Sequence, residues 1–216
     1  ARLGRTLFTA FAIALGVALV FATRIVSVAA DQQAQAARDS KLAGADLEVS
    51  PARAQFFPVS IADEILKNSA VEKTAPVYKH TLTESNLILL GVDPARVLTP
   101  YELIAGEDLT GFENLSGLVI WLPDTWAAQH GLGVGQTVRL TIRGEAYEYK
   151  VVGLLKAQPF GTPTAWLPLP TLQAALHTPD AANSILVRLK PGAALISAKA
   201  TLTEALGTAY IVTTAQ

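Results

Sequence analysis

The sequence predicts an α+β protein with a helical N-terminal extension. Three observations indicate this class. An uncharged apolar run lies near the N-terminus, strand-helix-strand patterns lie at 44–82 and 183–216, and a mainly β-patterned stretch lies between them at 83–182. Two β-α-β patterns that enclose a run of strands are typical of a split ferredoxin-like core with an inserted β-rich subdomain.

The composition is that of a packed protein without a strong net charge. Half of the 216 residues are hydrophobic, 16% are charged and the formal net charge is -1. The charges form no basic block, which argues against nucleic-acid binding. Cysteine is absent, so disulfides and cysteine metal sites are excluded. His80, His130 and His177 lack metal-ligand spacing, and we expect them to be surface or partly buried side chains.

Residues 1–30 are predicted to form a transmembrane helix. The 18 residues between Arg5 and Arg24 are uncharged. As a helix they span roughly 27 Å, close to the hydrocarbon thickness of a bilayer. Arg2 and Arg5 have no acidic neighbour, so the positive-inside tendency places the N-terminus in the cytoplasm. Two alternatives stay open: a signal peptide cleaved before Asp31, and a buried helix of a soluble protein.

Residues 31–43 are predicted to continue this helix as a stalk. Glycine and proline are absent from Val17 to Ala43, and the segment is rich in Ala, Gln and Arg, which favour helix. A continuous rod would couple the outer domain to the membrane segment, whereas a flexible tether would not. A plain helical spacer explains the same pattern. The candidate coupling positions along the rod are Arg24, Val28, Gln35 and Lys41.

The segment 44–82 is predicted to form a strand, a helix and a second strand. Residues 45–50 alternate apolar and acidic side chains, which is the period of a half-buried strand. Ser60 and Asp63 have the spacing of a capping box at the start of a helix. The second strand is expected over 77–82, after a proline.

The segment 83–182 is predicted to be mainly β, because short apolar runs alternate with Gly, Pro, Asn and Asp. Strands at 137–142 and 146–155 flank an Arg-Gly-Glu turn and predict a β-hairpin. A short helix is expected at 124–129. Further strands are expected at 87–92 and 118–122.

The segment 183–216 repeats the first pattern. A strand is expected at 184–189, followed by a Lys-Pro-Gly turn and a helix at 196–206. Gly207 ends this helix, and a last strand follows at 210–213. The chain would therefore close the same core that 44–82 begins.

No catalytic motif is present in the sequence. The glycine run at 131–136 leads into a strand and lacks the G-x-G-x-x-G spacing, so it does not fit nucleotide binding. The P-loop, the G-x-S-x-G elbow and S-x-x-K are also absent. Glu102, Glu107 and Asp108 cluster in a polar turn, where solvation explains them. Because glycosidase carboxylates have no fixed spacing, an anchored envelope enzyme stays an alternative. We expect no catalytic residue, cofactor or metal in this chain.

The large aromatic side chains fall into two groups. Trp121 and Trp166 lie in predicted strands, and we expect them in the core. Phe56, Phe57 and Phe160 lie in loops beside prolines or glycine. We take these three as candidate partner or substrate contacts, with buried loop anchors as the alternative.

Eight short segments follow one another in an ordered spacing. They are 5–7, 14–20, 44–47, 90–94, 106–109, 130–138, 149–155 and 167–173. Each alone is a turn or a buried strand edge. In this order they resemble the transmembrane subunits of MacB/FtsX-type ABC transporters, over the first membrane helix and the MacB-like periplasmic core domain.

The resemblance implies a permease with further membrane helices, in a homo- or heterodimer with a second permease copy. It implies a separate cytoplasmic ABC ATPase that binds ATP and Mg, and a bacterial inner membrane location with the main domain outside the cytoplasm. The chain would transmit an ATP-driven conformational change to export or release a substrate, with an envelope adaptor or substrate protein as a further partner. The alternative function is a stand-alone membrane-anchored binding or scaffold domain.

Overall fold

The computed structural model describes residues 44–215, except 100, 111, 113–116 and 159–160. Leu42–Ala215 form one compact unit. The predicted transmembrane and stalk helices, 1–30 and 31–43, lie outside the described residues. Within the described part of the chain, no helix is long and apolar enough to cross a membrane.

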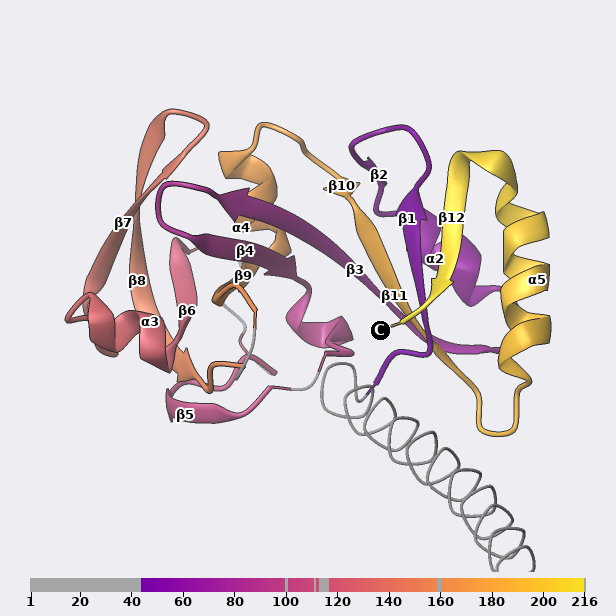
Figure 1. The fold of residues 1–216 in the computed structure, drawn as a ribbon, viewed down its shortest axis with the longest axis horizontal. Coiled ribbons are helices and arrows are strands. Elements are labelled where there is room, and N and C mark those ends of the chain that lie inside the picture. Colours follow the sequence, from indigo (N-terminus) through magenta and orange to yellow (C-terminus); the bar gives the residue numbers. More distant parts are fainter. Residues whose placement is uncertain (1–43, 100, 111, 113–116, 159–160, 216) are drawn as a thin grey trace, which may run out of the picture. The chain divides into compact units, whose positions relative to one another are not determined.

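Short helices alternate with strands along the described chain (Figure 1). The first elements are β1 (Leu47–Pro51), β2 (Phe57–Pro58), α2 (Ile61–Leu66), β3 (Val71–Leu82), β4 (Leu87–Val92) and η1 (Pro94–Arg96). The middle elements are β5 (Leu103–Gly106), β6 (Val119–Pro123), α3 (Asp124–Gln129), β7 (Thr137–Ile142), β8 (Glu145–Leu155), β9 (Thr164–Pro168) and α4 (Leu169–Ala175). The last elements are β10 (Ala181–Ala182), β11 (Ser184–Leu189), α5 (Leu195–Leu206), η2 (Gly207–Ala209) and β12 (Tyr210–Thr214).

Within the described residues, a 10-stranded mixed sheet has the order β12-β1-β11-β3-β4-β9-β6-β8-β5, and β7 pairs with β8. β2 and β10 form a separate two-stranded sheet. The pairs β4-β9 and β6-β8 are parallel, and the others are antiparallel. Figure 1 shows β12 and α5 at one end of the sheet and β7 and β8 at the other. The predicted α+β class is confirmed.

The two terminal β-α-β units interleave in this sheet. β11 lies between β1 and β3, and β1 lies between β11 and β12. Alternate residues of these strands, such as Val49 and Val187, share one core cluster with Ile65 of α2 and Leu202 of α5. Side chains alternate between the two faces of a strand, so these residues lie on one face of the sheet. Both helices pack against that face. The two units therefore share one hydrophobic core.

β3 begins earlier than predicted. The expectation of a strand that starts at Val77 is wrong, because the strand starts at Val71 and contains Pro76. The carbonyl oxygen of Val77 accepts a hydrogen bond from the N–H of Asn183 on the β11 side. The nitrogen of Pro76 therefore faces the β4 side, where the ladder reaches only to the pair Val77 and Val92. Proline has no backbone N–H, but no hydrogen bond between β3 and β4 is lost at this position.

The capping box expected at the start of α2 is wrong. Ser60 precedes the helix, but its side chain makes no capping hydrogen bond. Its backbone is already helical, with φ -56 and ψ -22, whereas a capping residue needs extended dihedrals to reach back to the first turn. Asp63 instead pairs with Arg96, with Oδ1 2.8 Å from Nη1.

The region 83–182 continues the same sheet as the terminal units. The helix expected at 124–129 and the strand at 137–142 occur at those bounds, and the hairpin partner is β8. Trp121 and Trp166 are buried, at 0% and 6% exposure, so the core placement of both is confirmed. The subdomain boundary at 83–182 stays a prediction, since one continuous sheet joins this region to the rest.

Candidate functional site

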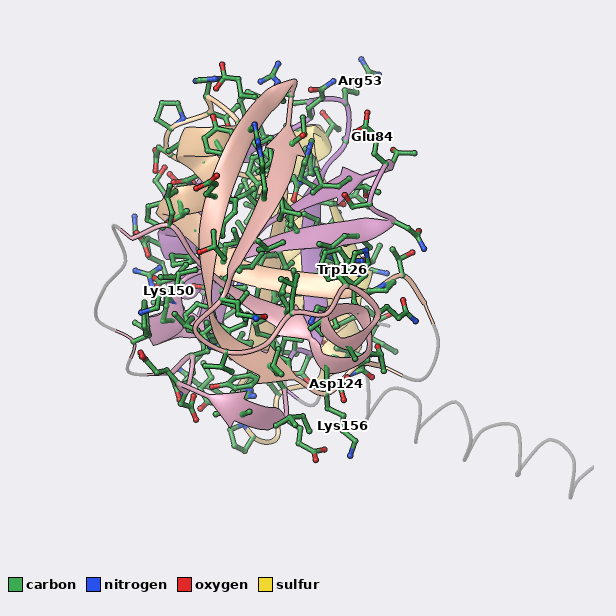
Figure 2. The ribbon with its side chains drawn as sticks, turned by 90° about the vertical axis from the view of Figure 1, so that its left-hand side faces the viewer. Arg53, Glu84, Asp124, Trp126, Lys150 and Lys156 are labelled. Carbon is green, nitrogen blue, oxygen red and sulfur yellow. The ribbon has the colours of Figure 1, made fainter. Side chains whose placement is uncertain are left out.

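Several charged side chains of the described part of the chain lie at its surface. Within these residues, no group of three His, Cys, Asp or Glu side chains could hold a metal ion. Figure 2 shows Glu84, Lys150 and Lys156 at the periphery of the domain, pointing away from one another. Lys156 forms an ion pair with Glu102, Nζ to Oε2 2.7 Å, in which both side chains are solvent-exposed. Such pairs are typical of a solvated surface.

Two adjacent candidate contact residues, Phe56 and Phe57, differ in their exposure to solvent. Phe57 is 4% exposed, whereas Phe56 is 44% exposed. Phe57 pairs with Ala182 in the β2-β10 sheet, and its ring meets that of Tyr210 edge-on, with centroids 5.7 Å apart. Phe57 is therefore a buried loop anchor, and Phe56 is the member of the pair that a partner could reach. The third candidate, Phe160, lies outside the described residues.

Contacts within the domain fix both ends of the loop 52–56. The N–H of Ala52 donates to the carbonyl oxygen of Ala209 at 2.9 Å, and Phe57 anchors the other end. Arg53 and Phe56 are exposed between these two anchors. Aromatic residues and arginine are both enriched at protein interfaces. We call loop 52–56 the tip loop.

The tip loop follows the C-terminal end of β1, whereas Asp46 and Ala215 lie at the other end of this strand. The N–H of Ala215 donates to the carbonyl oxygen of Asp46 at 3.0 Å. The residues that precede β1 and those that follow β12 therefore lie side by side. β1 then runs from Leu47 to Pro51 before the tip loop begins. Five residues of strand place the tip loop roughly 16 Å from that shared end.

Glu48 is the centre of a polar cluster on the sheet face away from α2 and α5. Its Oε1 accepts hydrogen bonds from Lys79 Nζ at 2.8 Å and from Ser184 Oγ at 2.5 Å. Burial opposes ionisation of the carboxyl group. The Lys79 charge and the hydrogen bonds from Lys79 and Ser184 together outweigh this effect and lower the pKa of Glu48. The cluster joins β1, β3 and β11.

The four predicted coupling positions, Arg24, Val28, Gln35 and Lys41, lie outside the described residues. Sequence reasoning missed Arg53 and the Glu48 cluster. Arg53 has a signal in the sequence, since it lies three residues before a Phe-Phe-Pro motif. Glu48, Lys79 and Ser184 had none, because the three are far apart along the chain and meet only through strand pairing.

The sequence profile of the MacB-like periplasmic core domain matches residues 6–205. The chain belongs to this family. Membership confirms the resemblance to permeases of the MacB/FtsX type, and it implies that the MacB-like domain lies outside the cytoplasm.

The solved structures that resemble this MacB-like domain include the following two. The periplasmic region of MacB from Actinobacillus actinomycetemcomitans has a TM-score of 0.62 and 15% identity, over 81% of this chain and 90% of that one. The extracellular domain of the noncanonic ABC-type transporter YknZ from Gram-positive bacteria has a TM-score of 0.57 and 16% identity, over 78% and 98%. At these identities the likeness concerns the fold alone. No curated protein matches the sequence.

The adjacent phenylalanines of this MacB-like domain provide a matched pair of variants. Phe57→Ala should lower the free energy of unfolding by about 3 kcal/mol, because it removes a buried ring. Phe56→Ala should lower it by clearly less, about 1 kcal/mol, because 44% of the side chain is already exposed to solvent. Urea unfolding of both variants tests the assignment. Equal losses of stability would contradict the division into anchor and exposed contact.

Glu48→Gln should make the stability less dependent on acid pH. The pKa of Glu48 is lowered when folded, so its contribution is present above its ordinary value of 4.5 and is lost as the pH falls through the folded value. We expect the variant to lose about 1 kcal/mol of unfolding free energy at neutral pH and to approach the wild type in acid. Urea unfolding across this range is the measurement, with exposed Glu204→Gln as control. A pH-independent difference would be the contrary result.

Proposed function

We propose that this chain is the extracytoplasmic domain and first membrane helix of an ABC transporter permease that transmits an ATP-driven conformational change across the membrane. Family membership supports the permease assignment. The observation that favours transmission is the shared end of the sheet, where the Asp46 carbonyl oxygen accepts from the Ala215 N–H at 3.0 Å. A displacement applied to the backbone at one end of a rigid sheet also moves the opposite end.

In this proposal the tip loop is a contact surface outside the membrane. The predicted helix 1–30 spans the bilayer with its N-terminus in the cytoplasm, and the stalk 31–43 leads to Gly44. The chain then crosses β1 before it reaches Arg53 and Phe56. These two exposed side chains would contact an envelope adaptor or a substrate protein.

The proposed assembly has further members. A cytoplasmic ABC ATPase would bind ATP and Mg, and a second permease copy would complete a dimer in the bacterial inner membrane. The chain itself would be non-catalytic. Within the domain, we propose that 44–82 and 183–216 form a split ferredoxin-like part and that 83–182 is the β-rich insertion. The interleaved order β12-β1-β11-β3 supports this division.

A stand-alone membrane-anchored binding or scaffold domain is the second candidate. The exposed Phe56 favours it as much as it favours the permease. The gene beyond Gln216 distinguishes the two functions. Three further apolar spans beside an ATPase gene are the result expected for the permease, whereas a stop codon after Gln216 would favour the anchored binding domain.

Transmission requires a continuous stalk. Insertion of Gly-Gly near Gln35 should abolish most of the transport while leaving membrane insertion and ATPase assembly intact, because glycine replaces a rod with a flexible joint. Insertion of Ala-Ala at the same place is the control, since it adds the same length and retains helix propensity. Transport and ATPase assembly are measured for both variants. Wild-type transport in the Gly-Gly variant would refute the rigid stalk.

A further inference from the structure

Strand β7 has one long edge without a partner strand in the described part of the chain. It pairs with β8 alone, and Figure 1 shows it on the outer side of β8 at one end of the sheet. The N–H of Val151 donates to the carbonyl oxygen of Gln136 at 2.8 Å, and the ladder then continues without a register shift. Because backbone groups alternate between the two sides of a strand, Thr137, Arg139 and Thr141 direct their N–H and C=O groups away from β8. All three residues are exposed.

The other outer strands of the described sheet, β12 and β5, do not offer such an edge. The bond between Ala215 and Asp46 fixes which residues of β12 face β1, and by alternation the backbone groups of Val212 face away. Val212 is nevertheless only 5% exposed, so the domain itself covers the middle of that edge. β5 has four residues, a register shift and a φ of 94 at Gly106. Short and irregular edges resist the addition of a strand, whereas β7 is regular over six residues.

The hydrophobic core holds β7 in its extended form. Val138, Leu140 and Ile142 are buried and belong to one core cluster. The strand is therefore ordered before a partner arrives, and binding would not require the domain to lose further backbone freedom. Addition of a strand to a preformed sheet edge is a common way in which proteins bind extended peptides.

Arg139 lies at the middle of the free edge and determines which charge a partner can carry there. It forms no ion pair with a described residue, including Glu148, its exposed neighbour across the ladder on β8. A residue of an added strand would lie opposite Arg139, where an acidic side chain is favourable and a basic one is unfavourable. A second copy of β7, paired antiparallel over 137–141, would place two Arg139 side chains opposite each other. An acidic peptide is therefore the better fit.

We propose that the outer edge of β7 binds an extended peptide segment of another protein, with an acidic side chain opposite Arg139. Backbone hydrogen bonds to Thr137, Arg139 and Thr141 would hold the segment, and the ion pair with Arg139 would select it. This site is separate from the tip loop. It goes beyond the proposed function, because it requires neither transmission of movement nor an ATPase.

Two synthetic peptides test this site on the full chain in detergent micelles. One is fluorescein-labelled Thr-Val-Glu-Val-Thr-Val amide, and the other has Lys in place of Glu. In fluorescence anisotropy, with empty micelles as the blank, we expect the Glu peptide to bind about fivefold more tightly than the Lys peptide. Arg139→Glu should reverse this preference. Lys190→Glu makes the same charge change at an exposed residue between β11 and α5, and this control variant should retain the preference.

Backbone pairing is tested separately from charge. Thr141→Pro removes an N–H that points away from β8, so no bond of the hairpin is lost and the domain should stay folded. Binding of the Glu peptide to this variant should be about tenfold weaker. Only one alternate set of peptide amides can face β7, so N-methylation of one set should weaken binding strongly and N-methylation of the other should not. Urea unfolding reports whether each protein variant is folded.

The outcomes separate a binding edge from a merely solvated one. If neither peptide binds, the proposal is overturned, and Arg139 is a charge that protects the edge from pairing. An unchanged preference in a folded Arg139→Glu variant, or equal binding of the two methylated peptides, also overturns it. The methylated peptides decide alone if Thr141→Pro does not fold. Dimerisation of the chain that Thr141→Pro abolishes would assign the edge to a second copy instead. Because these measurements use neither ATP nor transport, failure of the stalk mechanism in the Gly-Gly variant would leave this site unaffected.

Discussion

Strand β3 pairs with β11 along one edge and with β4 along the other, and the architecture depends on these two ladders. Val71–Val77 lie against β11, and Val77–Leu82 lie against β4. A strand of 12 residues is long enough to belong to both regions. Because β3 pairs with β11 over its first part and with β4 over its second part, the terminal β-α-β units and the β-rich region share one sheet.

Burial follows from this shared sheet. On one face, α2 and α5 cover β1, β11 and β12. Another core cluster places Ala75 and Leu186 with Trp121 and Trp166, so apolar residues of the terminal units pack with those of the β-rich region. Glu48, on the sheet face away from these helices, is paired with Lys79 and Ser184. A paired carboxylate there helps to hold the strand register, because its partners come from β3 and β11.

The proposed transmission of movement relies on the two ends of β1. The candidate contact, Phe56, is held between a backbone bond at Ala52 and the buried ring of Phe57. The chain connections lie at the other end of β1, joined through Asp46. A stiff sheet between these two points would transmit a displacement with little deformation of the domain, since close-packed interiors have low compressibility.

The sequence by itself determined the elements whose apolar period or turn residues are strong, together with the MacB-like family. The α3 helix at Asp124–Gln129 and the strand Ser184–Leu189 were predictable because local propensity and burial agree there. Tertiary structure alone decided that β3 starts at Val71, that Phe57 is buried while Phe56 is exposed, and that Asp46 binds Leu189 across a separation of 143 residues. The physical reason is that each of these features depends on a partner strand, and strand partners are distant in the sequence.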